Sequence, residues 1–390
     1  MEYISQFIKQ PKNTLSSKAN NFFKRIVSNH LKSLEESKLS IKINNINFYR
    51  KILLEGSLGA AESYIWGYWD TPNLVELIKF FIQKKENLKK LESGFHWPLY
   101  FLNTMIYFLK PNSTNNSKKN IKAHYDLSND FFSLFLDSKM MYSSAIYKDD
   151  TYTLEQASEY KLYSICEKVQ LKSNDKVLEI GSGWGGFAIY AAKNYGCHVT
   201  TITLSQKQYD YVENKIKDLN LENKIKILFK DYREVEGEFD KIVSIEMLEA
   251  VGHKYYPSYF KTIDRLLRHK GFALIQVITI EDQQYNRAKH EVDFIKKFIF
   301  PGSCIPSLTA LCDVMTENTQ LRILDVKDIG LDYAKTLLDW RDNFFKRVHD
   351  VKKMGFTDEF IRMWNFYLCY SVAGFETQYL SDLQLFILKR

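Results

Sequence analysis

Short apolar runs alternate with helical stretches from Lys176 onward, and this alternation constrains the fold more than any other feature of the chain. The apolar runs are rich in β-branched residues and bounded by turn residues, and helical stretches such as FAIYAAKNY lie between them. Alternation of this kind predicts a parallel sheet with helices on both faces. The runs expected to form strands are KVLEI, HVTTITL, IKILF, DKIVSI, FALIQVITI, LRILDV and LQLFILK.

The sequence therefore predicts an α/β fold: a doubly wound, seven-stranded, mostly parallel sheet of the Rossmann-like type. Long helices from Tyr333 and from Thr357 are expected before the last strand, which is a candidate for an antiparallel addition to the sheet. Earlier in the chain, we expect the stretch YYPSYFKTIDRLLRHKG to be helical up to Gly271, directly before the strand FALIQVITI.

A chain of 390 residues exceeds the usual single domain. The polar stretch PNSTNNSKKN lacks apolar periodicity and reads as a linker. We expect three parts: a smaller, mainly helical N-terminal domain over residues 1–110 that docks on lipid, a linker over 111–122, and a catalytic domain over 123–390.

The stretch EIGSGWGGF follows the first strand of the predicted sheet and opens a helix. Glycines at this place allow a tight turn and a close approach of the backbone to a ligand, and Gly181 and Gly183 are the expected contacts. The next strand ends in TLSQKQ and carries no carboxylate for the ribose of a dinucleotide, and no Lys-Ser/Thr pair follows the glycines. These two features argue against NAD and against a P-loop.

Glu179 stands two residues before the first glycine and suits a cationic ligand group better than a phosphate. An ammonium-bearing ligand without phosphate, such as S-adenosylmethionine, meets that requirement. The alternative is a solvated acid at the end of a strand. The pair Asp231-Tyr232 follows the third strand, where an adenine edge would be read, although such a pair is also common in ordinary turns.

Basic residues are concentrated in the first third of the chain. Residues 1–123 hold 19 Lys and Arg against 9 Asp and Glu, whereas the whole chain has a net charge of +7. Such a segment suits an anionic lipid surface or nucleic acid, or is a solvated basic face. The five Cys residues are scattered and form no CxxC pair, which predicts reduced thiols and no metal site.

Seven segments, in the same order, resemble cyclopropane-fatty-acid synthases and mycolic acid methyltransferases. They include HYDLSNDFFSLFLDSKMMYSSAIY, EIGSGWGGF, TLSQKQ and IVSIEMLEAVGHKYY, followed by DFIKKFIFPGSCIPS, DYAKTLLDWRDNF and YLCYSVAGF. AESYIWGYWD also resembles the N-terminal domain of the longer bacterial synthases, so the resemblance covers about residues 45 to 390.

The resemblance implies methyl transfer from S-adenosylmethionine to a cis double bond of a phospholipid acyl chain, then ring closure. A carbocation arises on the way, and aromatic faces can stabilise it. In the family, bound bicarbonate is held to remove the methyl proton. The residues that the resemblance places around bicarbonate are Ser144, Ile245, Glu249, Gln276, Ile278 and Tyr333. Those that it places around the cofactor are Tyr142, Ser143, Gly181, Gly183, Leu204, Gln208 and Tyr232, to which the strand-end reasoning adds Glu179.

The sequence departs from the family pattern at two places. Ser144 replaces a Cys of the MxYSCA motif, and Gln276 replaces a His in the strand that reads LIQVITI here. Both keep hydrogen-bonding capacity, but Gln276 cannot titrate. Glu249 and Tyr333 could also have purely structural roles, Glu249 as an acid at the start of a helix and Tyr333 as an aromatic residue packed in a helix. A methyl-branched product, another lipid or amine substrate, and a lipid-binding protein without activity stay open as alternatives.

We expect the partner to be membrane phospholipid rather than nucleic acid, because the core motifs are apolar and the basic excess is N-terminal. The expected location is the cytoplasm, peripheral on the inner face of the membrane, since the N-terminus lacks a signal-peptide pattern and no run of about 20 apolar residues occurs. Two features suit docking: four lysines at 84, 85, 89 and 90, and the apolar segment FHWPLYFLNTMIYFL, which is alternatively a core helix. A homodimer is one option for the oligomeric state.

Overall fold

The computed structural model of the protein describes residue 24, residues 39–84 and residues 127–390. The linker assigned to 111–122, three of the four docking lysines (Lys85, Lys89 and Lys90) and the segment Phe95–Leu109 lie outside these residues. Lys84 is described and is exposed just after a helix.

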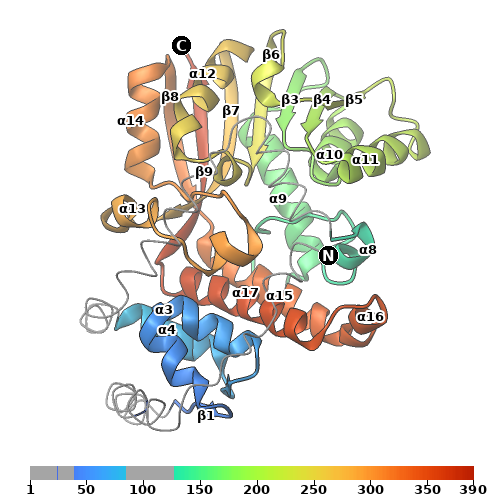
Figure 1. Ribbon diagram of the computed structural model, residues 1–390. Helices are drawn as coiled ribbons and strands as arrows, with labels where there is room; N and C mark the ends of the chain where they lie inside the picture. Colours follow the sequence, from blue (N-terminus) through green and yellow to red (C-terminus); the bar gives the residue numbers. More distant parts are fainter. Residues whose placement is uncertain (1–23, 25–38, 85–126) are drawn as a thin grey trace.

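A seven-stranded sheet forms the centre of the catalytic part (Figure 1), and each predicted strand is present. The strand order is β5-β4-β3-β6-β7-β9-β8. The chain runs outward from β3 to β5 and then returns to place β6 on the other side of β3. The strands are β3 (Lys176–Ile180), β4 (His198–Thr203), β5 (Ile225–Phe229), β6 (Phe239–Ile245), β7 (Leu267–Ile280), β8 (Leu321–Asp328) and β9 (Leu380–Lys389).

The closing strand β9 runs antiparallel to both of its neighbours, β7 and β8. It does not lie at the edge of the sheet but between those two strands. Its register pairs Gln276 with Gln384 and Ile278 with Asp382, so polar side chains of β9 lie beside the end of β7. The insertion of β9 therefore adds residues from the end of the chain to the site described below.

The helices alternate with the strands as predicted, except around β7. Helix α12 ends at Leu266 and the strand begins at Leu267, so the residues RHKG before Phe272 are strand and not helix. The register between β6 and β7 shifts in this region: Phe239 pairs with Leu267, whereas Lys241 pairs with Phe272. The residues between Leu267 and Phe272 therefore form an irregular start of β7. The other helices after residue 127 are α8 (Asn129–Ser133), α9 (Leu154–Lys168), α10 (Gly186–Tyr195), α11 (Gln206–Asp218), α13 (Asp282–Ala288), α14 (Leu308–Asn318), α15 (Gly330–Lys346), α16 (Val348–Lys353) and α17 (Asp358–Glu376).

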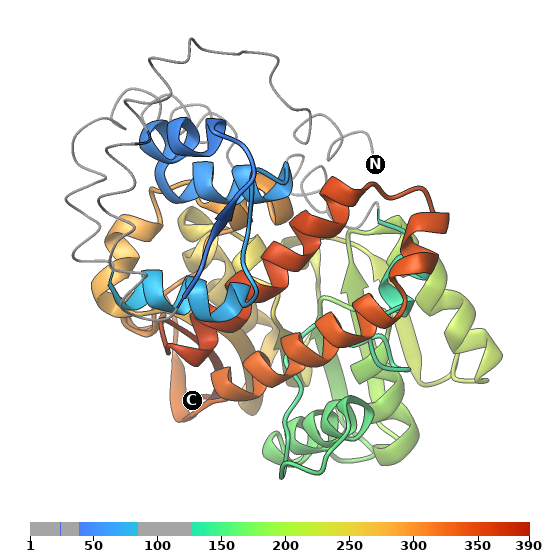
Figure 2. The same cartoon turned by 90° about the horizontal axis from the view of Figure 1, so that it is seen from below.

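Helices α15 and α17 pack against each other and lie across one end of the sheet (Figures 1 and 2). A short π-helical turn, Ile295–Ile299, lies nearby and contributes Phe298 and Ile299 to the same apolar cluster. Trp340 of α15 and Trp364 of α17 are fully buried in this cluster. The aromatic richness of the sequence is thus concentrated where the helices cover the sheet end.

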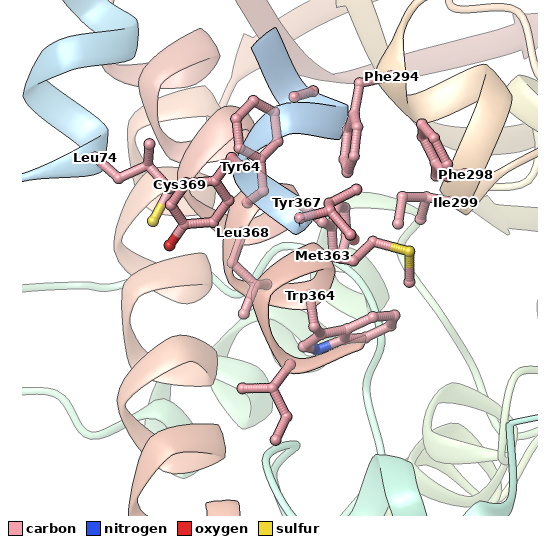
Figure 3. Packing of buried hydrophobic residues seen from close by; sticks show 14 of the residues in the cluster. Tyr64, Leu74, Phe294, Phe298, Ile299, Met363, Trp364, Tyr367, Leu368 and Cys369 are labelled. Carbon is pink, nitrogen blue, oxygen red and sulfur yellow. The ribbon is translucent and has the colours of Figure 1, made fainter. Parts of the chain in front are cut away.

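The N-terminal residues 39–84 form a small unit that rests on α17. It consists of α3 (Asn47–Ile65), α4 (Leu74–Gln83) and a two-stranded ribbon of β1 (Lys42–Ile43) and β2 (Trp69–Asp70). Figure 3 shows Tyr64 and Leu74 of this unit alongside Leu368 and Cys369 of α17. The Arg362 guanidinium donates to the carbonyls of Tyr64 and Trp69, which ties the unit to α17 through polar contacts as well.

Candidate functional site

The strand order reverses beside β3, and ligands of open α/β sheets bind where this reversal leaves room at the carboxyl ends of the strands. The turn that follows β3 carries Gly181 at φ 96° and Gly183 at φ 48°, both in the left-handed region that favours glycine. A Cβ atom built on Gly183 would have no heavy atom within 4 Å, so this glycine borders open space. One built on Gly181 would lie 3.2 Å from the Met247 side chain, just after β6. The turn thus keeps its ligand side bare and faces the end of β6.

Glu179 lies within β3 and is only 3% exposed, so it is not the solvated acid of the alternative reading. The Thr201 hydroxyl donates to its carboxylate at 2.5 Å. Burial raises the pKa of Glu179 to about 8, and the Thr201 hydrogen bond opposes this rise. A cationic ligand group nearby would favour the charged carboxylate, which fits the ammonium of S-adenosylmethionine.

The predicted cofactor residues after β4 and β5 lie at the same edge of the sheet. The Gln208 amide is buried at the start of α11, where the Thr203 hydroxyl donates to its carbonyl at 2.8 Å and leaves the amide N–H groups to other partners. Leu204 is half-buried just before that helix. Tyr232 is buried after β5, whereas the carboxylate of Asp231 is held by the Arg233 guanidinium at 2.7 Å. Asp231 therefore already has a protein partner.

Tyr142 and Ser143 lie in the segment before the sheet. The Tyr142 ring packs against Trp340, with 5.2 Å between centroids, and its hydroxyl is 3.0 Å from that of Tyr367. The Ser143 hydroxyl accepts a hydrogen bond at 2.5 Å from Lys161, an entirely buried lysine of α9. Tyr142 thus joins the aromatic cluster, and Ser143 joins a buried polar network.

Three of the residues assigned to the anion site meet at one carboxylate that our sequence analysis did not identify, Glu246. The backbone N–H of Ser144 donates to Glu246 Oε1 at 2.7 Å, and the Gln276 amide donates to the same oxygen at 2.8 Å. The Tyr333 hydroxyl donates to Oε2 at 2.7 Å. The Ser144 hydroxyl instead donates to the Ala145 carbonyl, so Ser144 reaches the site through its backbone.

Glu246 comes directly after β6 and has φ 47°, an unusual conformation for a residue with a side chain. Its backbone N–H donates to the Gln276 carbonyl at 2.8 Å, so the strand pairing holds this conformation in place. Such conformations cost on the order of 1 kcal/mol or more and are found at functional sites. A signal was available in the sequence, since Glu246 is the first residue after a predicted strand.

Glu249 and Ile278, which the resemblance placed around bicarbonate, contact each other through the backbone of Ile278. The Ile278 N–H donates to Glu249 Oε1 at 2.5 Å, while no hydrogen-bond partner for the buried Oε2 occurs among the residues the structure describes. Burial first, and then repulsion by Glu246, raise the pKa of Glu249 to about 8. Ile245 is the last residue of β6 and stands beside Gln276 in the register. All six predicted residues are therefore at the ends of β6 and β7 or face them.

Asp382 of β9 adds a third carboxyl group. The Gln276 side-chain amide donates to Asp382 at 2.8 Å as well as to Glu246, and the Gln384 side-chain amide donates to Gln276 Oε1 at 3.1 Å. Burial, with repulsion from Glu246 and Glu249, raises the pKa of Asp382 well above its usual range. Burial also raises the pKa of Glu246, but Lys161 and the donors around it oppose that rise. Asp382 therefore holds its proton more tightly, and Glu246 is the charged member of the pair.

The residues present fit S-adenosylmethionine but do not fit bicarbonate. The bare Gly183 turn and the buried Glu179 suit the former. Three of the six residues expected to hold bicarbonate, Ser144, Gln276 and Tyr333, already donate to Glu246, and an added anion would meet the charged Glu246 carboxylate. Within residues 39–84 and 127–390, no group of His, Cys, Asp or Glu is arranged to hold a metal ion. No helix in those residues is long and apolar enough to cross a bilayer.

Known proteins resemble the chain over most of its length. A model of the mycolic acid cyclopropane synthetase family matches residues 112–385. Tuberculostearic acid methyltransferase UfaA1 of Mycobacterium tuberculosis is 35% identical over 86% of this chain and 79% of its own. Cyclopropane-fatty-acyl-phospholipid synthase of Escherichia coli is 35% identical over 88% of this chain and 86% of its own.

Solved structures share the fold. The mycolic acid cyclopropane synthase CmaA1 complexed with SAH and CTAB superposes with a TM-score of 0.63, at 28% identity over 70% of this chain and 98% of the other. The cyclopropane synthase MmaA2 from Mycobacterium tuberculosis superposes with a TM-score of 0.65, at 26% identity over 70% of this chain and 98% of the other. The family match, the relatives and the glycine turn at the sheet reversal agree with one another. The chain therefore belongs to the mycolic acid cyclopropane synthetase family, a class of S-adenosylmethionine-dependent methyltransferases.

Proposed function

We propose that the protein transfers the methyl group of S-adenosylmethionine to the cis double bond of an unsaturated phospholipid acyl chain and closes a cyclopropane ring. The observation that carries this proposal is the juxtaposition of three parts at the sheet end. These are the bare glycine turn, the Glu246 carboxylate network and the aromatic rings of Tyr142, Trp340 and Tyr333.

Each part has a role in the proposed reaction. An alkene is a weak nucleophile and must be held against the methyl group in a site that excludes water. Its attack leaves a positive charge on carbon, which aromatic faces stabilise. The ring of Trp340 contacts those of Tyr142 and Tyr333, with centroid distances of 5.2 and 6.0 Å. The cation then needs a base, and carboxylates stand next to these rings.

We assign the cofactor to the residues at the ends of β3, β4 and β5. Glu179 would hold the ammonium group, and the bare turn at Gly181 and Gly183 would face the methionine portion. The remaining cofactor residues are Tyr142, Ser143, Leu204, Gln208 and Tyr232. The adenine contact is assigned to Tyr232 alone, since Asp231 is engaged by Arg233.

The name of the Escherichia coli relative supports a phospholipid substrate and a cyclopropane product. The name of the Mycobacterium tuberculosis relative supports a methyl-branched product as the second candidate. The chemistry favours the ring, because loss of a methyl proton closes it without any further reactant. A saturated methyl branch needs a hydride from a reductant.

We further propose that the protein works at the cytoplasmic face of the membrane as a peripheral protein. The support is the excess of Lys and Arg in residues 1–123, since a basic segment is attracted to anionic lipid.

The test is incubation with methyl-labelled S-adenosylmethionine and vesicles of phospholipid that carry either unsaturated or fully saturated acyl chains. The expected result is label in the acyl chains of the unsaturated vesicles alone, with the mass of a cyclopropane fatty acid. Label in the headgroup, or equal labelling of saturated lipid, would contradict the proposal. A methyl-branched mass would select the second candidate.

A further inference from the structure

We propose that the Glu246 carboxylate is the base of this enzyme, built into the protein at the place assigned to bicarbonate, so that the reaction needs no dissolved anion. This inference rests on the proposed methyl transfer to an acyl double bond. It concerns which group takes the proton once that transfer has occurred.

The first argument is the hydrogen-bond geometry around Glu246. Its two oxygens receive the Ser144 N–H, the Gln276 amide and the Tyr333 hydroxyl within 2.7 to 2.8 Å. Those are the donors that the sequence resemblance assigned to a bound anion. A carboxylate has the same charge and a similar planar pair of oxygens as bicarbonate, so it satisfies the same donors.

The second argument is charge. Glu246, Glu249 and Asp382 lie together, and Lys161 of α9 is the buried basic side chain that acts on Glu246. Burial lowers the pKa of Lys161, whereas the charge of Glu246 opposes this and favours the protonated lysine. One lysine can balance one carboxylate in such a site, while Asp382 and Glu249 keep their protons because burial raises the pKa of each. An additional anion would have to enter beside Glu246 without a further cation, which burial makes costly. The site is therefore balanced with Glu246 as its anion.

The third argument is the backbone. At φ 47°, Glu246 adopts a conformation that glycine would adopt more readily, and yet a residue with a long acidic side chain stands there. In this strained conformation the Glu246 carboxylate accepts hydrogen bonds from Ser144, Gln276 and Tyr333, which lie in three other parts of the chain. A residue with only a structural role at this turn would not need the acid.

The step balances as follows. The alkene electrons form a bond to the methyl carbon, and the carbon–sulfur bond breaks with its electron pair left on sulfur. The positive charge then resides on the other alkene carbon. Glu246 takes a proton from the transferred methyl group, and the electrons of that C–H bond close the ring. The product is a neutral cyclopropane and a protonated Glu246, which returns its proton to water before the next turnover.

Two variants test the proposal. Glu246→Gln keeps the shape and the acceptor oxygen but cannot take a proton, and its cyclopropane formation should fall by about 10² to 10⁴-fold. Glu246→Gly removes the acid and relieves the backbone, and it should regain activity when bicarbonate is added. The exposed Glu222→Gln is the matched control and should retain activity. Thermal melting and S-adenosylhomocysteine binding, unchanged in all three, would show that each variant is folded.

The decisive comparison uses the unaltered enzyme in carbonate-free and carbonate-containing buffer. We expect equal rates in both, with rescue by bicarbonate confined to Glu246→Gly. A wild-type rate that falls without bicarbonate, or a fully active Glu246→Gln, would overturn the role of Glu246 while leaving the proposed function intact. Failure of the proposed function itself would appear differently, as a wild-type enzyme that makes no cyclopropane product in either buffer.

Discussion

Removing one hydroxyl group from the Glu246 site should shift the pH dependence of the enzyme by a predictable amount. Tyr333→Phe deletes the donor that lies 2.7 Å from Glu246 Oε2 and keeps the ring, which stacks on Phe375 with 4.6 Å between centroids. A hydrogen bond to a charged group contributes about 1.5 to 3 kcal/mol. Each pKa unit corresponds to about 1.4 kcal/mol, so the pKa of Glu246 should rise by about one to two units.

The sign follows from which form the hydroxyl stabilises. Tyr333 donates to the charged carboxylate, so its loss favours the protonated form, and Glu246 then becomes inactive as a base at higher pH. The acidic limb of the kcat profile should therefore move upward. The other charged and titrating groups that face Glu246 are Lys161, Glu249 and Asp382, and all of them are unchanged in this variant.

The assay is cyclopropane formation on unsaturated phospholipid vesicles over a range of pH, with S-adenosylhomocysteine affinity measured in parallel. Tyr195→Phe is a matched control, because the Tyr195 hydroxyl also donates to a glutamate, Glu167, at 2.7 Å but far along the chain from the site. The control should keep the wild-type profile. If Tyr333→Phe lowered kcat equally at all pH values with no shift of the limb, the titration of Glu246 would not govern the rate.

Three further predictions concern the cofactor, Glu249 and the membrane. Gly183→Leu should abolish S-adenosylhomocysteine binding in calorimetry, because its Cβ would have no protein atom within 4 Å and the side chain would stand on the ligand side of the turn; the left-handed φ of 48° should cost on the order of 1 kcal/mol of stability. NAD should not bind to the wild-type protein or to the variant, and micromolar NAD affinity would refute the cofactor assignment. Glu249→Gln should lower kcat by far more than it weakens cofactor binding, because its carboxylate orients the Ile278 backbone beside the base; equal losses would make Glu249 structural. Replacing the lysines at 84, 85, 89 and 90 by Glu should weaken sedimentation with anionic vesicles, at about 1 kcal/mol for each Lys near the surface, while cofactor affinity is kept; binding that ignores lipid charge and salt would contradict electrostatic docking.

The sequence was sufficient to predict all seven strands, because continuous apolar runs between turn residues have few other interpretations in a chain with alternating helices. Its errors were at boundaries, where Leu267 to Gly271 extend β7 instead of α12. The position of β9 between β7 and β8 was not predictable from local pattern, since it depends on which neighbours the last strand meets after two long helices. That position brings Asp382 and Gln384 to the site.

In the candidate site, too, some residues could be predicted from the sequence and others depended on the tertiary structure. Ser144, Gln276 and Tyr333 were assigned to the site through motifs, but their common hydrogen-bond partner Glu246 was not. Two glutamates stand three residues apart after β6, and the sequence alone does not say which one meets the donors. The answer depends on the left-handed turn at Glu246, a backbone property that no residue pattern signals when the residue is not glycine. Lys161 was equally hidden, as an ordinary lysine within a helix.

The most direct test of the account follows the methyl hydrogens. The enzyme is supplied with S-adenosylmethionine that carries a fully deuterated methyl group, and the acyl product is analysed by mass spectrometry. If the alkene takes the methyl group and a base then removes one of its hydrogens, the product will be a cyclopropane that has lost one deuterium from each transferred methyl group. A product that retains all of the methyl deuterium, or an acyl chain that carries none, would contradict the account.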